Sequence, residues 1–176
     1  MSTTDSSLVI ETLNGDREAF GRLVEKYERR IFNLAFRICS DYEDAMDVTQ
    51  TVFVKAFDRL GTFDPSRKFF SWLYRMGVNE SLNQVKRRSR IVHVEFDPPS
   101  RAPGPDQQII REESNGLVQT ALRRLGEDQR VVIILRHFVD LSYRQIGDVL
   151  GIPEKTVKSR LYSARQRMKE ILTEAG

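Results

Sequence analysis

The sequence has 176 residues, of which 40% are hydrophobic and 30% are charged, and its formal net charge is +3. This length suits one domain or two small ones, and a single cysteine excludes both a disulfide framework and a zinc site built from several cysteines. We expect a soluble, cytoplasmic protein, because the sequence lacks a signal peptide and any run of about 18 apolar residues that could insert into a membrane.

The N-terminal third predicts three helices. A short helix over residues 8–13 ends at an Asn-Gly pair, and Asp16 can cap a long helix that runs to Cys39. Ser40, with a glutamate three residues later, forms a capping-box pattern that predicts the start of a third helix. Cys39 lies within the apolar pattern of the long helix, so we expect it to be a small core residue.

Charge is segregated between the third helix and the segment that follows it. Residues 41–58 carry five acidic residues and one lysine, a net charge of −4, whereas residues 67–90 carry seven basic residues and one glutamate, a net charge of +6. Glycine and proline in residues 61–67 predict a loop, and a fourth helix is predicted over residues 68–89. The opposite charges of the two helices suggest two different partners.

The fourth helix interleaves aromatic and basic residues. Aromatic rings stack on bases and cations follow phosphates, so the pattern is compatible with binding to single-stranded nucleic acid. Burial in the core is the better explanation for four of its apolar side chains, which are Phe69, Trp72, Leu73 and Met76. Phe63 and Asn79 remain as exposed candidates that could hold an extruded base.

A tether separates this half of the chain from the next. Residues 91–106 contain four prolines and no helical period, which predicts an extended, flexible linker. Helices are predicted over residues 107–125 and from about residue 129 to 138.

The C-terminal segment has the pattern of a helix-turn-helix. Ser142 can cap a short helix over residues 143–150, Gly151 breaks it, and Pro153 is suited to the first turn of a second helix. Gly147 completes the pattern, because a side chain at this position would hold the two helices apart.

The second helix of this motif is amphipathic and basic. Residues 142–170 have a net charge of +4. The stripe opposite the apolar one can donate to base edges and phosphates through Lys155, Lys158, Ser159, Tyr162, Ser163 and Arg165. An ordinary helical hairpin with a solvated basic face is the alternative, but it explains the small residues at the turn poorly. The pattern therefore indicates DNA binding.

The chain order of these motifs resembles the extracytoplasmic function (ECF) group of bacterial sigma-70 factors. The resemblance rests on the segments 44–83 and 141–168, separated by the tether, and covers residues 16–172. It implies an all-α fold of two small helical domains, with a sigma-2 domain over 1–90, a flexible linker over 91–106, and a sigma-4 domain with the helix-turn-helix over 107–176. It also implies a subunit that directs promoter-specific initiation without catalysis, a cofactor or a small-molecule substrate.

The resemblance assigns residues to three binding surfaces. Core polymerase, through the beta-prime clamp, would be bound by Asp44, Asp47, Val48, Gln50 and Phe53. Melted minus-10 DNA would be bound by Phe63, Arg75, Asn79, Lys86, Arg87 and Arg88. The minus-35 duplex would be bound by Arg136, Lys155, Thr156, Lys158, Ser159, Arg160, Tyr162, Ser163 and Arg165, of which Arg160 and Arg165 suit phosphate or structural contacts. The beta flap and an anti-sigma factor are further expected partners, and the latter could hold the protein at the inner face of the membrane.

Two residues depart from the pattern of this family. Lys155 stands where the family commonly has glycine, and Ser163 stands where it commonly has arginine. An arginine that grips guanine with two hydrogen bonds contributes about 1–3 kcal/mol of discrimination, so the promoter sequence of a relative does not transfer to this chain.

Two other classes of function compete with this interpretation. A stand-alone helix-turn-helix regulator would use the N-terminal half for dimerisation or effector binding, but it leaves the acidic third helix and the basic fourth helix unexplained. An enzyme is less favoured, because His93 and His137 have no cysteine or histidine at metal-ligand spacing and no nucleophile partner.

Overall fold

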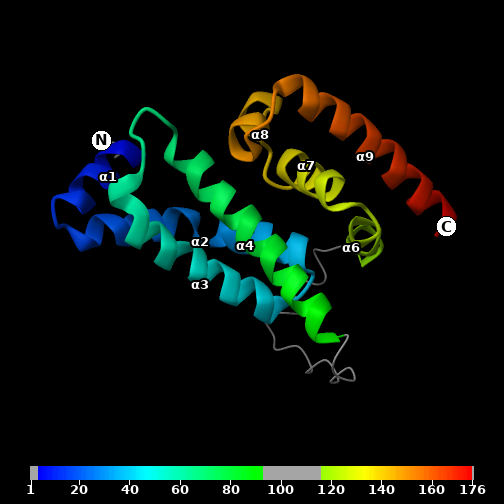
Figure 1. Cartoon of the computed structure of the whole chain (residues 1–176), viewed down its shortest axis with the longest axis horizontal. Coiled ribbons are helices and arrows are strands. Elements are labelled where there is room, and N and C mark those ends of the chain that lie inside the picture. Colours follow the sequence, from blue (N-terminus) through cyan, green and yellow to red (C-terminus); the bar gives the residue numbers. More distant parts are fainter. Residues whose placement is uncertain (1–3, 93–115, 176) are drawn as a thin grey trace.

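The computed structural model describes residues 4–92 and 116–175, and within these ranges every regular element is a helix. The elements in chain order are α1 (Asp5–Leu13), α2 (Arg17–Cys39), α3 (Tyr42–Arg59), the 3-10 turn η1 (Leu60–Thr62), α4 (Phe69–Val92), α6 (Gly116–Arg123), α7 (Glu127–His137), α8 (Tyr143–Leu150) and α9 (Glu154–Glu174) (Figure 1). The expected all-α class is confirmed. The predicted linker lies outside the described residues from position 93 onward, and so does the first part of the helix predicted from residue 107.

Helices α1 to α4 form an N-terminal bundle. The long helix α2 packs against both α3 and α4, which also pack against each other, and α1 covers its N-terminal end (Figure 1). Its inward stripe is fully buried, with Leu23, Ile31 and Leu34 at 0% exposure, and Leu73 of α4 is equally buried. Spacing by three or four residues predicts this stripe, because it places side chains on one side of a helix.

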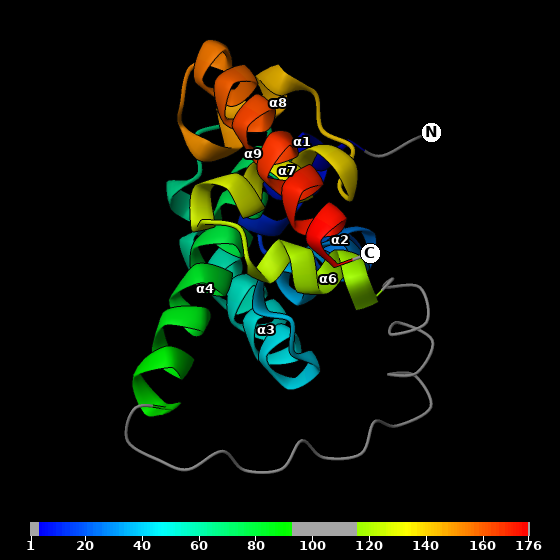
Figure 2. The same cartoon turned by 90° about the vertical axis from the view of Figure 1, so that its right-hand side faces the viewer.

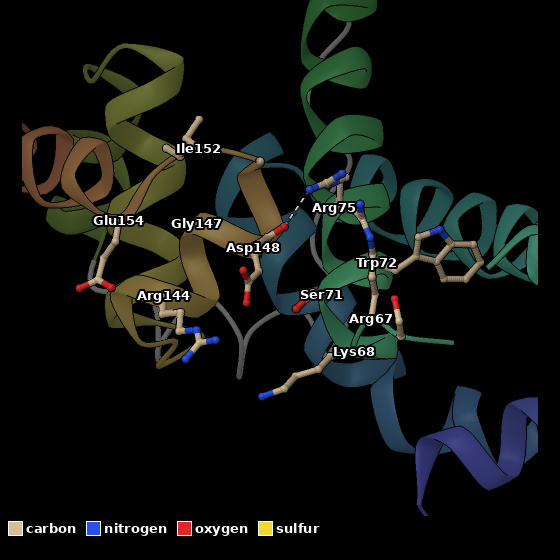
Figure 3. Close-up of a pocket in the computed structure, with 12 residues that line it drawn as sticks. Arg67, Lys68, Ser71, Trp72, Arg75, Arg144, Gly147, Asp148, Ile152 and Glu154 are labelled. Atoms are coloured by element: carbon tan, nitrogen blue, oxygen red, sulfur yellow. Dashed lines mark hydrogen bonds between the residues drawn. The ribbon is translucent and has the colours of Figure 1, made fainter. Parts of the chain in front are cut away.

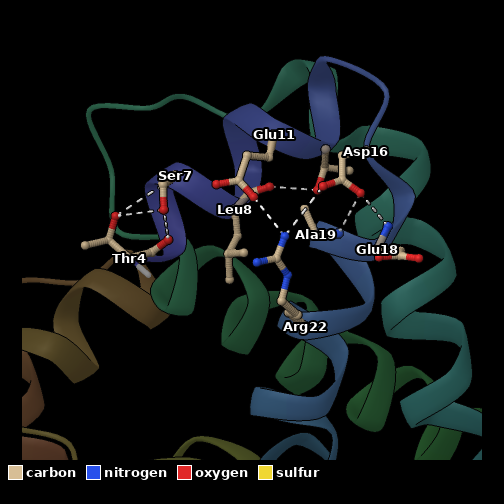
Figure 4. Close-up of polar contacts among 9 residues, drawn as sticks. Thr4, Ser7, Leu8, Glu11, Asp16, Glu18, Ala19 and Arg22 are labelled. Carbon is tan, nitrogen blue, oxygen red and sulfur yellow. Dashed lines mark hydrogen bonds and ion pairs between the residues drawn. The ribbon is translucent and has the colours of Figure 1, made fainter. Parts of the chain in front are cut away.

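Polar side chains fix the corner between α1 and α2. The Asp16 carboxylate accepts from the backbone amides of Glu18 and Ala19 at 2.9 and 3.3 Å, which confirms the predicted cap of α2. Arg22 also reaches back from α2 to the carboxylates of Glu11, at 2.9 Å, and Asp16, at 3.5 Å (Figure 4). These contacts hold α1 across the start of the bundle.

The predicted capping box at Ser40 is wrong. Ser40 adopts a left-handed conformation, with φ at 58°, and ends α2 by donating its amide to the carbonyl of Phe36. The N-cap of α3 is Asp41, whose carboxylate accepts from the amide of Asp44 at 3.0 Å. Ser40 is the C-cap of α2 and therefore does not also cap α3. The next residue, Asp41, has a side chain that can accept from backbone amides, and it is the N-cap of α3.

Helices α6 to α9 form a C-terminal bundle whose motif confirms the predicted helix-turn-helix. Ser142 and Gln145 make a reciprocal capping box at the start of α8, and Gly151 ends that helix with φ at 68°. A Cβ on Gly147 would lie 2.8 Å from the carbonyl oxygen of Ile152, closer than real Cβ contacts come. Gly147 therefore allows the close approach of α8 to the turn.

The two bundles contact each other where helices end. Arg75 of α4 donates to the carbonyls of Val149 and Asp148, at 2.9 and 2.8 Å, near the C-terminus of α8. At the C-terminus of α2, Gln119 of α6 donates at 3.0 Å to the carbonyl of Arg37. Figure 2 shows the C-terminal bundle lying against α4 and α2. Helix C-termini leave carbonyls unpaired, and these side chains supply the missing donors.

Candidate nucleic-acid interface

The outward face of α9 is exposed, as expected for a recognition helix. Val157, Leu161 and Ala164 are buried against α7 and α8. The opposite stripe is open to solvent, and on it lie Lys155, Lys158, Ser159, Tyr162 and Ser163. Tyr162 is 69% exposed, so its ring is free to contact a partner. A helix of this kind, preceded by a tight turn, fits the major groove of duplex DNA.

Three of the predicted DNA-contacting arginines are engaged within the C-terminal bundle. Arg136 donates to the carbonyl of Leu141 at 3.0 Å, and Arg160 pairs with Asp128 at 3.1 Å. Arg165 lies 3.4 Å from the Nε2 atom of His137. Partial burial, together with Arg165 and Arg136, lowers the pKa of His137. The sequence predicts structural or phosphate roles for Arg160 and Arg165, and the observed contacts are structural.

Two further residues of the predicted minus-35 set have protein partners. The Lys158 ammonium lies 3.2 Å from Glu154, one turn earlier on α9, and remains 59% exposed. Thr156 is half-buried in the first turn of α9, where its amide donates to the carbonyl of Pro153 at 2.9 Å. Lys158 can exchange its exposed ion pair for a phosphate at little cost, because such pairs contribute about 1 kcal/mol or less.

Sequence reasoning missed Gln129, which lies in the first turn of α7. Its Nε2 atom donates to the Oγ atom of Ser163 on α9 at 2.9 Å. The two residues are 34 positions apart, so no local pattern links them. A glutamine side chain therefore stands beside Ser163, one of the residues predicted to face the minus-35 duplex.

The basic residues of α4 are divided between free and paired side chains. Arg88 binds the carboxylates of Asp41 and Asp44 at 2.9 and 3.1 Å, and Lys86 reaches Glu127 of α7 at 3.3 Å. Burial raises the pKa of Asp41, but hydrogen bonds from the amide of Asp44 and from Arg88 outweigh it, and the net shift is downward.

The remaining minus-10 candidates on α4 lie at its surface. Asn79 and Arg87 are exposed. Arg75 is half-buried and occupied by the carbonyls of α8. The structure thus brings Asn79 and Arg75, one helical turn apart, to the side of α4 that faces α8.

The expectation that Phe63 is exposed is wrong. Its side chain is 8% exposed, and its ring lies 5.1 Å from the ring of Trp72 and 5.8 Å from that of Phe69. The turn η1 folds the chain back, with the amide of Phe63 donating to the carbonyl of Leu60 at 3.1 Å, and this directs the ring into the bundle. The aromatic residues of α4 complete a buried cluster with Phe63. Among the four residues predicted as core, Phe69 and Leu73 are buried, and Trp72 and Met76 are half-buried.

A cavity of about 560 Å³ lies between α4 and α8 (Figure 3). Its cationic lining comes from Arg67, Lys68, Arg75 and Arg144, and its acidic lining from Asp148 and Glu154. Figure 3 shows that these side chains come from both bundles and that Arg75 reaches from α4 to α8. The mixed charge suits a polypeptide partner that carries both acidic and basic groups.

The outer surface of α3 differs from the expected docking surface. Val48 and Phe53 are only 4% and 8% exposed, so these two side chains belong to the core and present little surface to a partner. Asp47 and Gln50 are exposed as expected. Asp44 is less accessible, because it accepts hydrogen bonds from Gln84 at 2.8 Å and from Arg88.

Apolar side chains that the sequence analysis did not single out complete this surface. Met46, Val54 and Phe57 of α3 are 48%, 56% and 43% exposed. With Gln50 they recur at intervals of three or four residues, which places them along one outward stripe. We name the exposed residues Met46, Asp47, Gln50 and Val54 the α3 surface.

Cys39 is half-buried and unpaired, and its Sγ atom lies 3.6 Å from the carbonyl oxygen of Ser81. Burial, followed by the charge of Asp44, raises the pKa of its thiol to about 12.

Residues 4–92 and 116–175 contain no group of three or more histidine, cysteine or acidic side chains that could hold a metal ion. Over the same ranges, no helix is long and apolar enough to cross a membrane.

Comparison with known proteins gives a consistent result for both bundles. Residues 23–91 match the family model of Sigma-70 region 2, and residues 115–168 match that of Sigma-70, region 4. The chain is 34% identical to the RNA polymerase sigma-H factor of Pseudomonas aeruginosa, over 96% of this chain and 93% of that protein. It is 31% identical to the ECF RNA polymerase sigma-E factor of Escherichia coli strain K12, over 93% of this chain and 91% of that protein.

The fold is also similar to a solved structure. The structure of CnrH in complex with the cytosolic domain of CnrY superimposes with a TM-score of 0.78 at 28% sequence identity. The match covers 98% of this chain and 99% of that one. The similarity therefore includes both bundles.

Proposed function

Because the chain belongs to the ECF group of sigma-70 factors, it is a subunit that directs promoter-specific initiation by RNA polymerase, and we propose how its surfaces divide this task. The observation that carries the proposal is the exposed, basic face of α9 behind a tight helix-turn-helix. The protein acts by recognition alone and has no catalytic role.

The C-terminal bundle places α9 in the major groove of the minus-35 duplex. Lys158, Ser159 and Tyr162 face base edges, since they are exposed on one side of the helix. Lys155, at the start of α9, contacts a phosphate, and phosphate contacts orient the helix without reading sequence. Arg136, Arg160 and Arg165 support α9 through their contacts within the bundle.

The N-terminal bundle binds the melted minus-10 strand along α4. Asn79 is suited to a base edge because it is an exposed carboxamide, and Arg75, Arg87 and Lys86 are suited to phosphates because they lie along the same basic helix. Arg88 contributes by ordering the start of α3 through Asp41.

The α3 surface docks on the beta-prime clamp of core polymerase. Its exposed apolar side chains supply buried area on binding, and Asp47 supplies charge complementarity to a basic partner. The C-terminal bundle contacts the beta flap, as the resemblance to the family implies.

An anti-sigma factor is a further proposed partner. The structural relative CnrH is bound to the cytosolic domain of CnrY, and its two-bundle arrangement is similar to that of this chain. The cavity between α4 and α8 offers both signs of charge to such a polypeptide. The protein acts in the cytoplasm, and a membrane-bound anti-sigma factor would hold it at the inner face of the membrane.

The test is run-off transcription across a bacterial genome with sigma-free core polymerase and the purified protein. Discrete start sites that share two spaced upstream motifs are expected. Lys158→Ala should weaken binding to the minus-35 duplex while co-elution with polymerase persists. Arg167→Ala, more than two turns beyond Lys158 on α9 and in an exposed ion pair with Glu170, is the matched control and should bind normally. Retained duplex binding without polymerase binding or discrete starts would instead favour a stand-alone regulator.

A further inference from the structure

The contact between α7 and α9 assigns a DNA-reading role to a residue outside the recognition helix. We propose that Gln129 reads a base of the minus-35 element and that Ser163 positions its side chain. This inference rests on the proposed placement of α9 in the major groove. It concerns the part of the exposed face of α9 that surrounds Ser163.

The location of Gln129 suits this role. Ser163 is exposed on α9, one turn after Ser159 and next to Tyr162. Its Oγ atom accepts from the Nε2 atom of Gln129 at 2.9 Å, so the carboxamide stands at the edge of the proposed base-reading face. The short side chain of Ser163 does not extend far from α9, and Gln129 reaches it from the neighbouring helix α7.

The side chain of Gln129 is held in a defined position. Two consecutive residues of α7 bind α9, since Asp128 pairs with Arg160 at 3.1 Å and Gln129 binds Ser163. Arg160 and Ser163 are nearly one turn apart, so the two contacts fix the first turn of α7 against α9. Less conformational entropy is then lost when the carboxamide binds a base.

The remaining hydrogen-bonding groups of Gln129 match adenine. Ser163 takes one of the two Nε2 hydrogens, and within the described part of the chain the side chain makes no other hydrogen bond. The second hydrogen can be donated to N7 of adenine while the Oε1 atom accepts from its N6 amino group, the usual bidentate contact of glutamine. The ligand class is therefore an A·T pair in the duplex.

The test is selection from a promoter library with a randomised minus-35 element, using holoenzyme assembled from the full chain. The wild type should prefer adenine at one position. Gln129→Ala should reduce the discrimination at that position about 5- to 150-fold and leave the other positions unchanged. Gln129→Glu should move the preference toward cytosine, whose N4 amino group a carboxylate accepts. Ser163→Ala should weaken the preference partly, because it removes the positioning contact and keeps the carboxamide.

Arg124→Ala is the matched control, since Arg124 is exposed and pairs with Glu174 at 2.8 Å, outside the contact of Gln129 with Ser163, and its variant should keep the adenine preference. Far-UV circular dichroism of each variant verifies its helical content. Unchanged preferences in Gln129→Ala, or an equal loss of affinity for every sequence, would overturn the inference while the proposed function stands. Failure of the wild type to select any minus-35 motif would overturn the proposed function, and the inference with it.

Discussion

Replacing Gly147 with alanine should destabilise the helix-turn-helix by forcing α8 away from the following turn. The added Cβ would lie 2.8 Å from the carbonyl oxygen of Ile152, whereas ordinary van der Waals contact begins at 3.4 Å. That peptide cannot move freely, because the amide of Ile152 donates to the carbonyl of Gly147 at 3.1 Å. The strain must therefore be relieved by a shift of backbone.

The size of the effect follows from two opposing contributions. Overpacking of a tight contact costs about 1–3 kcal/mol. Inside a helix, alanine stabilises the folded state by about 0.5–1 kcal/mol relative to glycine, because less backbone entropy is lost on folding. The expected net loss in the free energy of unfolding is about 0–2.5 kcal/mol, centred near 1 kcal/mol. Gly21→Ala in α2 is the matched control, because a Cβ there meets no atom within 4 Å and only the favourable contribution applies.

Urea unfolding followed by far-UV circular dichroism measures the stability of both variants, and hydrogen exchange of the Ile152 amide reports on the turn itself. Gly147→Ala should exchange this amide faster than the wild type and bind the minus-35 duplex more weakly, while Gly21→Ala should do neither. If Gly147→Ala is as stable as Gly21→Ala and binds the duplex normally, the steric reasoning is refuted.

Three further predictions concern the N-terminal bundle. Asp47→Arg reverses a charge of the α3 surface and should abolish co-elution with core polymerase, whereas Glu28→Arg on α2 should not; unchanged co-elution of the Asp47 variant would contradict the proposed docking surface. Phe63→Ala should lower stability by about 3–5 kcal/mol and lose polymerase binding together with promoter opening. If the Phe63→Ala variant folds, binds polymerase and fails only at promoter opening, Phe63 would again be assigned to capture of an extruded base. The pKa of Cys39 is about 12, so its thiol is protonated at pH 8, and alkylation should be slow in native protein and fast in urea. Rapid alkylation of the native protein at pH 8 would contradict the burial of this thiol.

The parts of the fold that depend on neighbouring residues were predictable from the sequence. The caps at Asp16 and Ser142 follow from the side chain and the two or three amides after it, and both are observed. The role of Gly147 was also predictable, since a helix-turn-helix requires a close approach at that position. The cap at Ser40 was not, because serine and aspartate stand side by side there and the end of α2 decides between them.

The features that depend on distant residues were not predictable in this way. The burial of Phe63 depends on how η1 folds back onto α4, and the contact of Gln129 with Ser163 joins positions 34 residues apart. The exposure of Met46 and Val54 depends on which side of α3 the other helices cover. The periodicity of apolar residues predicts which side of a helix is buried. The packing of the other helices determines which apolar residues at the edge of that side stay exposed to solvent.

Arg75 has a single guanidinium group, and this group now serves the C-terminal end of α8. A phosphate of the minus-10 strand that bound the same Nε and Nη2 atoms would displace the two carbonyls, so binding of that strand through these donors and contact of Arg75 with α8 exclude each other. The two equilibria are then thermodynamically linked: a ligand that draws the bundles together weakens DNA binding, and DNA favours their separation by the same free energy. One side chain thereby couples the relative position of the bundles to occupancy of the promoter.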